Sequence, residues 1–186
     1  MSKLLLHVCC GPCSIYPLQA LKEKGFQVTA FFYNPNIHPY QEYKKRLETF
    51  YQFAQGENLA TITCGEEYLP EGFLRQVVFR EEKRCGFCYA QRLEETAKIA
   101  KKDNFSYFST TLLVSPYQKH ELIKEIGEEM GNRYGVEFYY QDFRTGWKEG
   151  VEKCRELELY RQPYCGCIYS EKDRYYKRGK GPKCKV

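Results

Sequence analysis

The chain has 186 residues, a formal net charge of +5, 42% hydrophobic and 16% aromatic residues, and ten cysteines. This composition excludes a disordered chain, and the sequence has neither a run of roughly 20 apolar residues, which a membrane span needs, nor the pattern of a signal peptide in its first residues. We therefore expect a cytoplasmic protein without a membrane partner, in which the cysteines serve metal or redox chemistry rather than a disulfide framework.

The first part of the chain alternates strand-like with helix-like segments. Apolar, β-branched and aromatic composition predicts strands over residues 3–8, 26–33 and 59–63. Helical periodicity predicts helices over residues 14–24 and 40–55. A Gly-Pro pair lies between the first strand and its helix, so the loop 9–13 directly follows the carboxyl end of that strand.

The same alternation continues after residue 90. The sequence predicts a helix over 92–102, a strand over 107–114, a helix that opens at Ser115-Pro116 and stops at Gly135, and a strand over 136–140. Such alternation is typical of an α/β fold with a parallel, doubly wound sheet, which binds ligands outside the carboxyl ends of its strands. We expect residues 1–186 to form a single domain, with a helical segment and basic tail, residues 147–186, packed on it.

Seven of the ten cysteines fall into three clusters: Cys9, Cys10 and Cys13; Cys85 and Cys88; Cys165 and Cys167. The first two clusters lie just ahead of predicted helices, and a helix N-terminus lowers the pKa of a thiol. Three thiols within five residues, beside Gly11 and Pro12, favour a metal or redox site over simple packing. The isolated Cys64, Cys154 and Cys184 are interpreted as bystanders.

Four cysteines of the first two clusters suit either a structural zinc ion or a 4Fe-4S cluster, because both accept four thiolates. The adjacent pair Cys9-Cys10 has poor geometry for a zinc knuckle, which favours the iron-sulfur cluster. The pair Cys165 and Cys167 has two interpretations, a strained disulfide with a redox role or a two-thiolate metal site.

Several other residues have weaker signals. His7 alternates with apolar neighbours and is expected to be a packed imidazole, whereas His38 and His120 are weak catalytic candidates. Asp142 follows a predicted strand at its carboxyl end, where it suits a metal ligand, a proton donor or a turn residue. The tail from residue 177 is basic and follows a segment with Arg174, Tyr175 and Tyr176, a pattern that fits either RNA binding or a solvated terminus.

Four motifs together resemble one known family. HVCCGPCS at 7–14, RCGFCYAQRL at 84–93, TTLLVSPYQ at 110–118 and YCGCIYSEKDRYY at 164–176 are similar, in this order, to the epoxyqueuosine reductase family of the QueH type. The resemblance implies reduction of the epoxide of epoxyqueuosine in a tRNA anticodon to queuosine, the last step of queuosine biosynthesis. It also implies a fold similar to nucleotide-alpha-hydrolase-like (HUP) domains, although CCGPCS stands where such domains have an SGGxDS phosphate loop.

The resemblance assigns roles to the cysteines. Cys9, Cys10, Cys85 and Cys88 would be the ligands of a 4Fe-4S cluster, and Cys165 and Cys167 a redox-active pair. An additional iron ion held by Cys165 and Cys167, with Cys13 or Asp142 nearby, is the alternative to a disulfide. The reaction also needs an external electron donor.

Two other classes of protein remain as alternatives. One is a cluster-containing tRNA-modifying transferase of the PP-loop type, which the missing phosphate loop argues against. The other is a zinc-stabilised RNA-binding module without catalytic activity.

Overall fold

The structure is a computed structural model that describes residues 2–63 and 68–177. Cys64, Cys184 and the basic tail beyond Lys177 lie outside the described residues. The helices and strands follow one another as β1 Lys3–Val8, α1 Gly11–Glu23, β2 Gln27–Phe32, α2 Tyr40–Gly56, β3 Ala60–Thr63, α3 Glu71–Val77, α4 Arg84–Lys102, β4 Tyr107–Thr110, α5 His120–Tyr134, β5 Glu137–Phe138, α6 Trp147–Glu156 and α7 Ile168–Tyr175.

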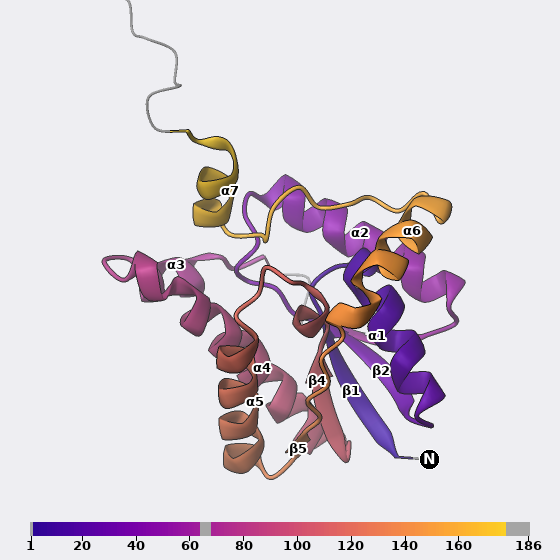
Figure 1. Cartoon of the computed structure of the whole chain (residues 1–186). Helices are drawn as coiled ribbons and strands as arrows, with labels where there is room; N and C mark the ends of the chain where they lie inside the picture. Colours follow the sequence, from indigo (N-terminus) through magenta and orange to yellow (C-terminus); the bar gives the residue numbers. More distant parts are fainter. Residues whose placement is uncertain (1, 64–67, 178–186) are drawn as a thin grey trace, which may run out of the picture.

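The five strands form one parallel sheet in the order β3-β2-β1-β4-β5. Helices α1 and α6 lie on one side of the sheet and α4 and α5 on the other (Figure 1). The expected α/β fold with a doubly wound parallel sheet is therefore confirmed. In such a sheet the chain reverses its winding direction at the central strand, here between β1 and β4, and ligands bind at that point.

The centre of the sheet is the core of the molecule. Residues Leu4, Leu5 and Leu6 of β1 are fully buried, as expected for a strand that is covered by helices on both faces. Gly11 allows α1 to lie close to α2, because a Cβ at this position would be 2.7 Å from the carbonyl oxygen of Thr49. The glycine of the CCGPC loop is thus required by helix packing.

Several predicted boundaries differ from the structure, and one helix was not predicted. The strand expected over 107–114 ends at Thr110 and continues as a 3₁₀ helix, η2 (Thr111–Val114), whose first turn is capped when the Thr110 side chain accepts a hydrogen bond from the backbone N–H of Leu112. The helix expected from Ser115-Pro116 begins only at His120. The helix expected over 92–102 begins at Arg84, so Cys85 and Cys88 lie within its first turns rather than ahead of it. Helix α3 was not predicted at all.

The last described part of the chain crosses the carboxyl edge of the sheet. After α6, which packs beside α1, the segment 157–167 runs over this edge to α7 (Figure 1). Arg84 of α4 forms an ion pair with Asp173 of α7. The C-x-C motif is therefore brought to the same end of the sheet as the cysteines that follow β1.

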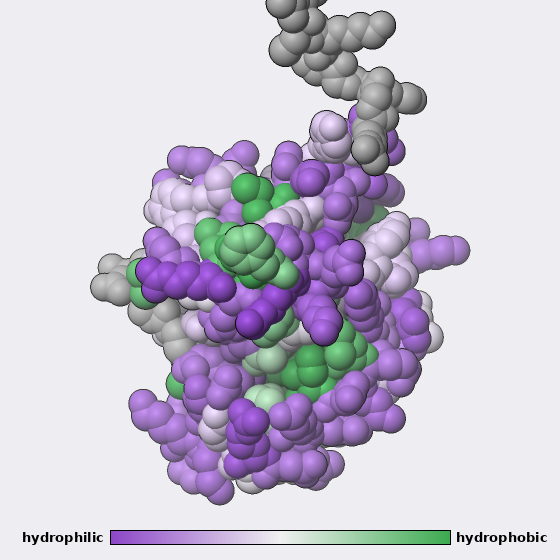
Figure 2. All heavy atoms as spheres, turned by 90° about the vertical axis from the view of Figure 1, so that its left-hand side faces the viewer, coloured by the Kyte–Doolittle hydropathy of each residue, from purple (hydrophilic) through white to green (hydrophobic). Residues whose placement is uncertain are grey.

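The surface is mainly hydrophilic, with separate apolar patches on the face that carries α3 to α5 (Figure 2). Val78 and Phe79, directly after α3, are exposed apolar residues, and Phe79 is 93% exposed. None of the described helices combines the length and the apolar character that crossing a bilayer would require.

Candidate thiol site

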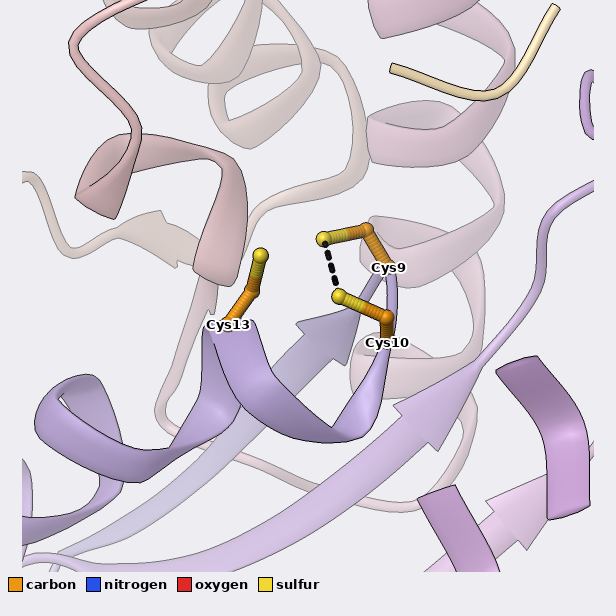
Figure 3. A group of neighbouring side chains, drawn as sticks. All are labelled: Cys9, Cys10 and Cys13. Atoms are coloured by element: carbon orange, nitrogen blue, oxygen red, sulfur yellow. Dashed lines mark hydrogen bonds between the residues drawn. The ribbon is translucent and has the colours of Figure 1, made fainter. Parts of the chain in front are cut away.

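Cys9, Cys10 and Cys13 form one compact group of sulfur atoms at the carboxyl end of β1. Cys9 and Cys10 come from the loop after the strand and Cys13 from the first turn of α1, and the three side chains point toward one another (Figure 3). All three are buried, their Sγ atoms lie within 4.8 Å of one another, and the Cys9 and Cys10 sulfurs are 3.7 Å apart. Two thiolates on one tetrahedral zinc ion are about 3.8 Å apart, given a Zn–S bond of about 2.3 Å. This group can therefore bind a soft metal.

The three thiols differ in acidity. Contacts with the Cys10 and Cys13 side chains lower the pKa of Cys9 well below its usual range, and the hydroxyl of Thr111 adds to this effect. Burial raises the pKa of Cys10. Without a metal, these contacts therefore favour a thiolate at Cys9.

Cys85 and Cys88 lie in the first turns of α4. Cys85 is half-buried and packs against the main core, whereas Cys88 is buried with Cys167 and Phe73 in a smaller cluster. Burial raises the pKa of the Cys88 thiol to about 12, although the positive charge of Arg92 opposes this shift. The structure thus brings Cys88 and Cys167 together but leaves Cys85 and Cys88 outside the tight sulfur group.

The C-x-C segment is held by the buried Arg46 of α2. The guanidinium donates hydrogen bonds to the carbonyl oxygens of Cys165 (2.8 Å) and Tyr164 (2.9 Å), and its third contact is an ion pair with Glu42 at 2.7 Å. Gly166 has a φ of +146°, a conformation that favours glycine, and a Cβ there would lie 3.3 Å from the Arg46 Nη1 atom. The segment is therefore fixed to α2 through its backbone.

Cys165 is exposed and Cys167 is buried, and all eight cysteines in the described residues are free thiols. Four sulfurs each accept a hydrogen bond from a different side chain; the pairs are Thr111 with Cys9 (3.3 Å), Gln162 with Cys13 (3.1 Å), Arg92 with Cys88 (2.8 Å) and Gln118 with Cys165 (3.1 Å). Thr111, Arg92 and Gln118 stand within the family motifs but had no role assigned from the sequence. Gln162 and Arg46 were not predicted, because each lies at least 119 positions along the chain from the cysteine it serves.

A cavity of about 670 Å³ opens beside these thiols. Its wall includes Cys9, Cys13 and Cys165, and also the aromatic rings of Tyr117 and Trp147, which contact each other edge to face with centroids 6.2 Å apart. The cationic side chains of Arg161 and Arg174 complete part of the wall. The volume lies within the roughly 300–1,000 Å³ that is common for small-molecule sites.

Asp142 is hydrogen-bonded to Arg144 and does not line the cavity. Its carboxylate accepts hydrogen bonds from the backbone N–H and the guanidinium of Arg144, and it lies 4.0 Å from His120 Nδ1. The Arg144 hydrogen bonds hold the pKa of Asp142 down at about 2. The carboxyl is therefore ionised at neutral pH, a state that suits a metal ligand or a turn residue better than a proton donor.

His7 is a packed imidazole, as predicted. It is fully buried, and its ring nitrogens contact the Thr110 hydroxyl at 2.9 Å and the carbonyl oxygen of Tyr33 at 3.1 Å. Burial, followed by the charge of Arg92, lowers its pKa to about 3, so the ring is neutral. His38 and His120 are also buried, and neither lines the cavity.

A buried group of thiols at the winding-reversal point of a parallel sheet defines an α/β protein with a thiol site suited to a soft metal. A family model described as "Epoxyqueuosine reductase QueH" matches residues 4–173. The chain therefore belongs to the epoxyqueuosine reductase QueH family, and the resemblance found in its motifs is confirmed.

Individual relatives agree with this assignment. An epoxyqueuosine reductase QueH from Dehalococcoides mccartyi is 38% identical over 175 residues, which cover 94% of this chain and 96% of the relative. One from Thermotoga maritima is 37% identical, over 94% of this chain and 93% of the relative. A solved structure described as a predicted subunit of tRNA methyltransferase from Methanocaldococcus jannaschii shares the fold, with a TM-score of 0.56 and 14% identity over 84% of this chain and 75% of the other.

Proposed function

We propose that this protein reduces the epoxide of epoxyqueuosine in tRNA to queuosine. The observation that carries the proposal is the family match over residues 4–173, in a chain in which Cys9, Cys13 and Cys165 line one cavity. The reaction adds two electrons and two protons to the substrate, and the epoxide oxygen leaves as water. An external electron donor must supply the electrons.

We assign Cys9, Cys10, Cys85 and Cys88 as ligands of a 4Fe-4S cluster. The donor chemistry fits, because these are free thiols, and Cys9, Cys10 and Cys88 are buried. Thr111 and Arg92 donate hydrogen bonds to the Cys9 and Cys88 sulfurs, as is common around thiolate-bound clusters. When bound, such a cluster supplies electrons one at a time.

Cys165 and Cys167 are proposed to supply the electron pair, and two electrons from the external donor then reduce the resulting disulfide back to two thiols. Oxidation of two thiols to a disulfide releases two electrons and two protons, the same numbers that the epoxide consumes. The alternative use of these thiols is to hold an iron ion, with Cys13 or Asp142 as a further ligand. Cys13 supports this alternative, since its sulfur faces the cavity that Cys165 also lines.

The cavity is proposed as the site of the modified nucleotide. Bases of a single-stranded anticodon loop can be unstacked and placed on aromatic side chains, and Tyr117 and Trp147 provide such rings. Arg161 and Arg174 provide positive charge for the phosphate backbone.

The test combines metal analysis with product analysis. Protein purified without oxygen is expected to contain iron and sulfide, and to convert epoxyqueuosine tRNA into queuosine tRNA with a reductant present, as measured by mass spectrometry of the nucleosides. Zinc without iron or sulfide, together with no conversion, would favour the RNA-binding module instead. Binding of ATP would favour the transferase of the PP-loop type.

A further inference from the structure

Arg92 is a buried cation that faces a sulfur atom. It lies one turn after Cys88 on α4 and is only 2% exposed. Its Nη2 donates a hydrogen bond to Cys88 Sγ at 2.8 Å, and its Nε donates one to the Cys88 carbonyl oxygen at 3.1 Å.

No carboxylate neutralises this charge within the parts of the chain that the structure describes, residues 2–63 and 68–177. The acidic group that Arg92 contacts is instead the thiol of Cys88, whose Sγ accepts its hydrogen bond at 2.8 Å. The other fully buried arginine, Arg46, has Glu42 at 2.7 Å. The two buried arginines therefore differ: Arg46 has a carboxylate partner, whereas Arg92 has none among the described residues.

A buried charge without a partner is costly, so buried charges in proteins are paired or bound to metals. The fold has placed a permanent positive charge where only sulfur can carry the matching negative charge. The planar guanidinium forms two hydrogen bonds to one residue, and this geometry fixes the charge relative to the sulfur.

We propose that Arg92 is the built-in counter-charge of the thiolate centre at Cys88, and that it raises the reduction potential of the cluster bound there. The proposal rests on the proposed function, which supplies the cluster. Each electron added to a thiolate-bound cluster makes the centre more negative, and a fixed positive charge stabilises the reduced state more than the oxidised one. Arg92 is thus a positioning residue that acts through Cys88, and it does not contact the substrate cavity.

The test is a redox titration of the anaerobically reconstituted protein, followed by visible absorption. Arg92→Met and Arg92→Gln remove the charge, and both are expected to shift the one-electron reduction equilibrium at least tenfold toward the oxidised cluster, about 59 mV more negative. Arg92→Lys keeps a positive charge but lacks the planar guanidinium, and its reduction potential should lie between those of the neutral variants and the wild type. Lys102→Met removes a charge from the exposed end of the same helix and is expected to leave the potential unchanged.

A potential unchanged in Arg92→Met, at the same iron content as the wild type, would refute the role of Arg92. A shift of equal size in Lys102→Met would refute it as well, because the loss of any positive charge on α4 would then change the potential. If the neutral variants do not fold, Arg92→Lys decides: a potential shifted by about 59 mV or more despite the retained positive charge overturns the proposal. Failure of the wild type to bind iron would instead overturn the cluster assignment, which the iron content reports separately.

Discussion

Replacing Arg46 by methionine removes the contact that holds the C-x-C segment on α2. The substitution deletes one ion pair and two hydrogen bonds to carbonyl oxygens, and it leaves the carboxylate of Glu42, which is 7% exposed, without its cation. Removing one partner of a buried pair costs about 3–5 kcal/mol. The Tyr160 hydroxyl still donates to Glu42 at 2.6 Å, so we expect the lower end, about 3 kcal/mol.

The free energy of unfolding from urea titration measures this effect. A double variant, Glu42→Gln with Arg46→Met, should recover about half of the loss, because the unpaired carboxylate is gone while the two carbonyl oxygens remain unsatisfied. Lys44→Gln is the matched control on the same helix: its pair with Glu48 is exposed, and its loss should cost less than about 0.5 kcal/mol.

The Arg46 variant should also lose activity, since the backbone of Cys165 is no longer fixed. Faster alkylation of Cys165, measured by mass spectrometry of the cysteine peptides, is expected in the folded variant. The expected role of Arg46 is refuted if the free energy of unfolding of Arg46→Met lies within about 1 kcal/mol of the wild-type value. It is also refuted if the double variant is less stable than the single one.

Three further substitutions test the site and the fold. Cys165→Ser should abolish turnover while the visible absorption of the cluster persists; loss of the absorption would make Cys165 a cluster ligand. Trp147→Ala should raise the KM for tRNA by about 5- to 150-fold, the equivalent of roughly 1–3 kcal/mol for one lost base–aromatic stack, and an unchanged KM would remove the ring from the substrate site. Gly11→Ala should lower the free energy of unfolding by about 1–3 kcal/mol, because its Cβ would meet the Thr49 carbonyl. Gly56→Ala is the control: its Cβ would meet no atom within 4 Å, so this change should be neutral or stabilising. Equal effects of the two substitutions would contradict the role of Gly11 in helix packing.

The alternation of strands and helices was predictable because it depends on local periodicity. Residues 3–8 and 107–110 are apolar and β-branched, and both are strands in the structure. The error at 111–114 has a physical cause: all four residues of η2 are buried, and a short buried run has the same composition whether it is a strand or a 3₁₀ helix. Helix α4 was predicted too short because Cys85 and Gly86 are poor helix formers, a preference that packing against α3 and α5 overrides.

The gathering of Cys9, Cys10 and Cys13 was equally predictable, since their spacing in the sequence is short. A shared role of this group with the other two cysteine clusters rests on the resemblance to the family and stays a prediction. Sequence separation explains why: Arg46 reaches Cys165 across 119 positions, and Gln162 reaches Cys13 across 149. Only the path of the chain over the sheet edge determines such pairs.

The four side chains that donate hydrogen bonds to cysteine sulfurs have a common chemical effect. Hydrogen bonds to an anionic acceptor are stronger than those to a neutral one, so every donor that faces a sulfur favours the more negative state of that sulfur. Three of the four donors come from η2, the loop before α5 and the segment before α7, far along the chain from the sulfurs that they serve, whereas Arg92 lies one turn after Cys88 on α4. The thiol loop carries no basic residue between Cys9 and Cys13, and the side-chain hydrogen bonds that reach these two sulfurs from outside the loop come from the distant Thr111 and Gln162. Loosening any of these elements should therefore make the thiol centre harder to reduce even when every cysteine is intact.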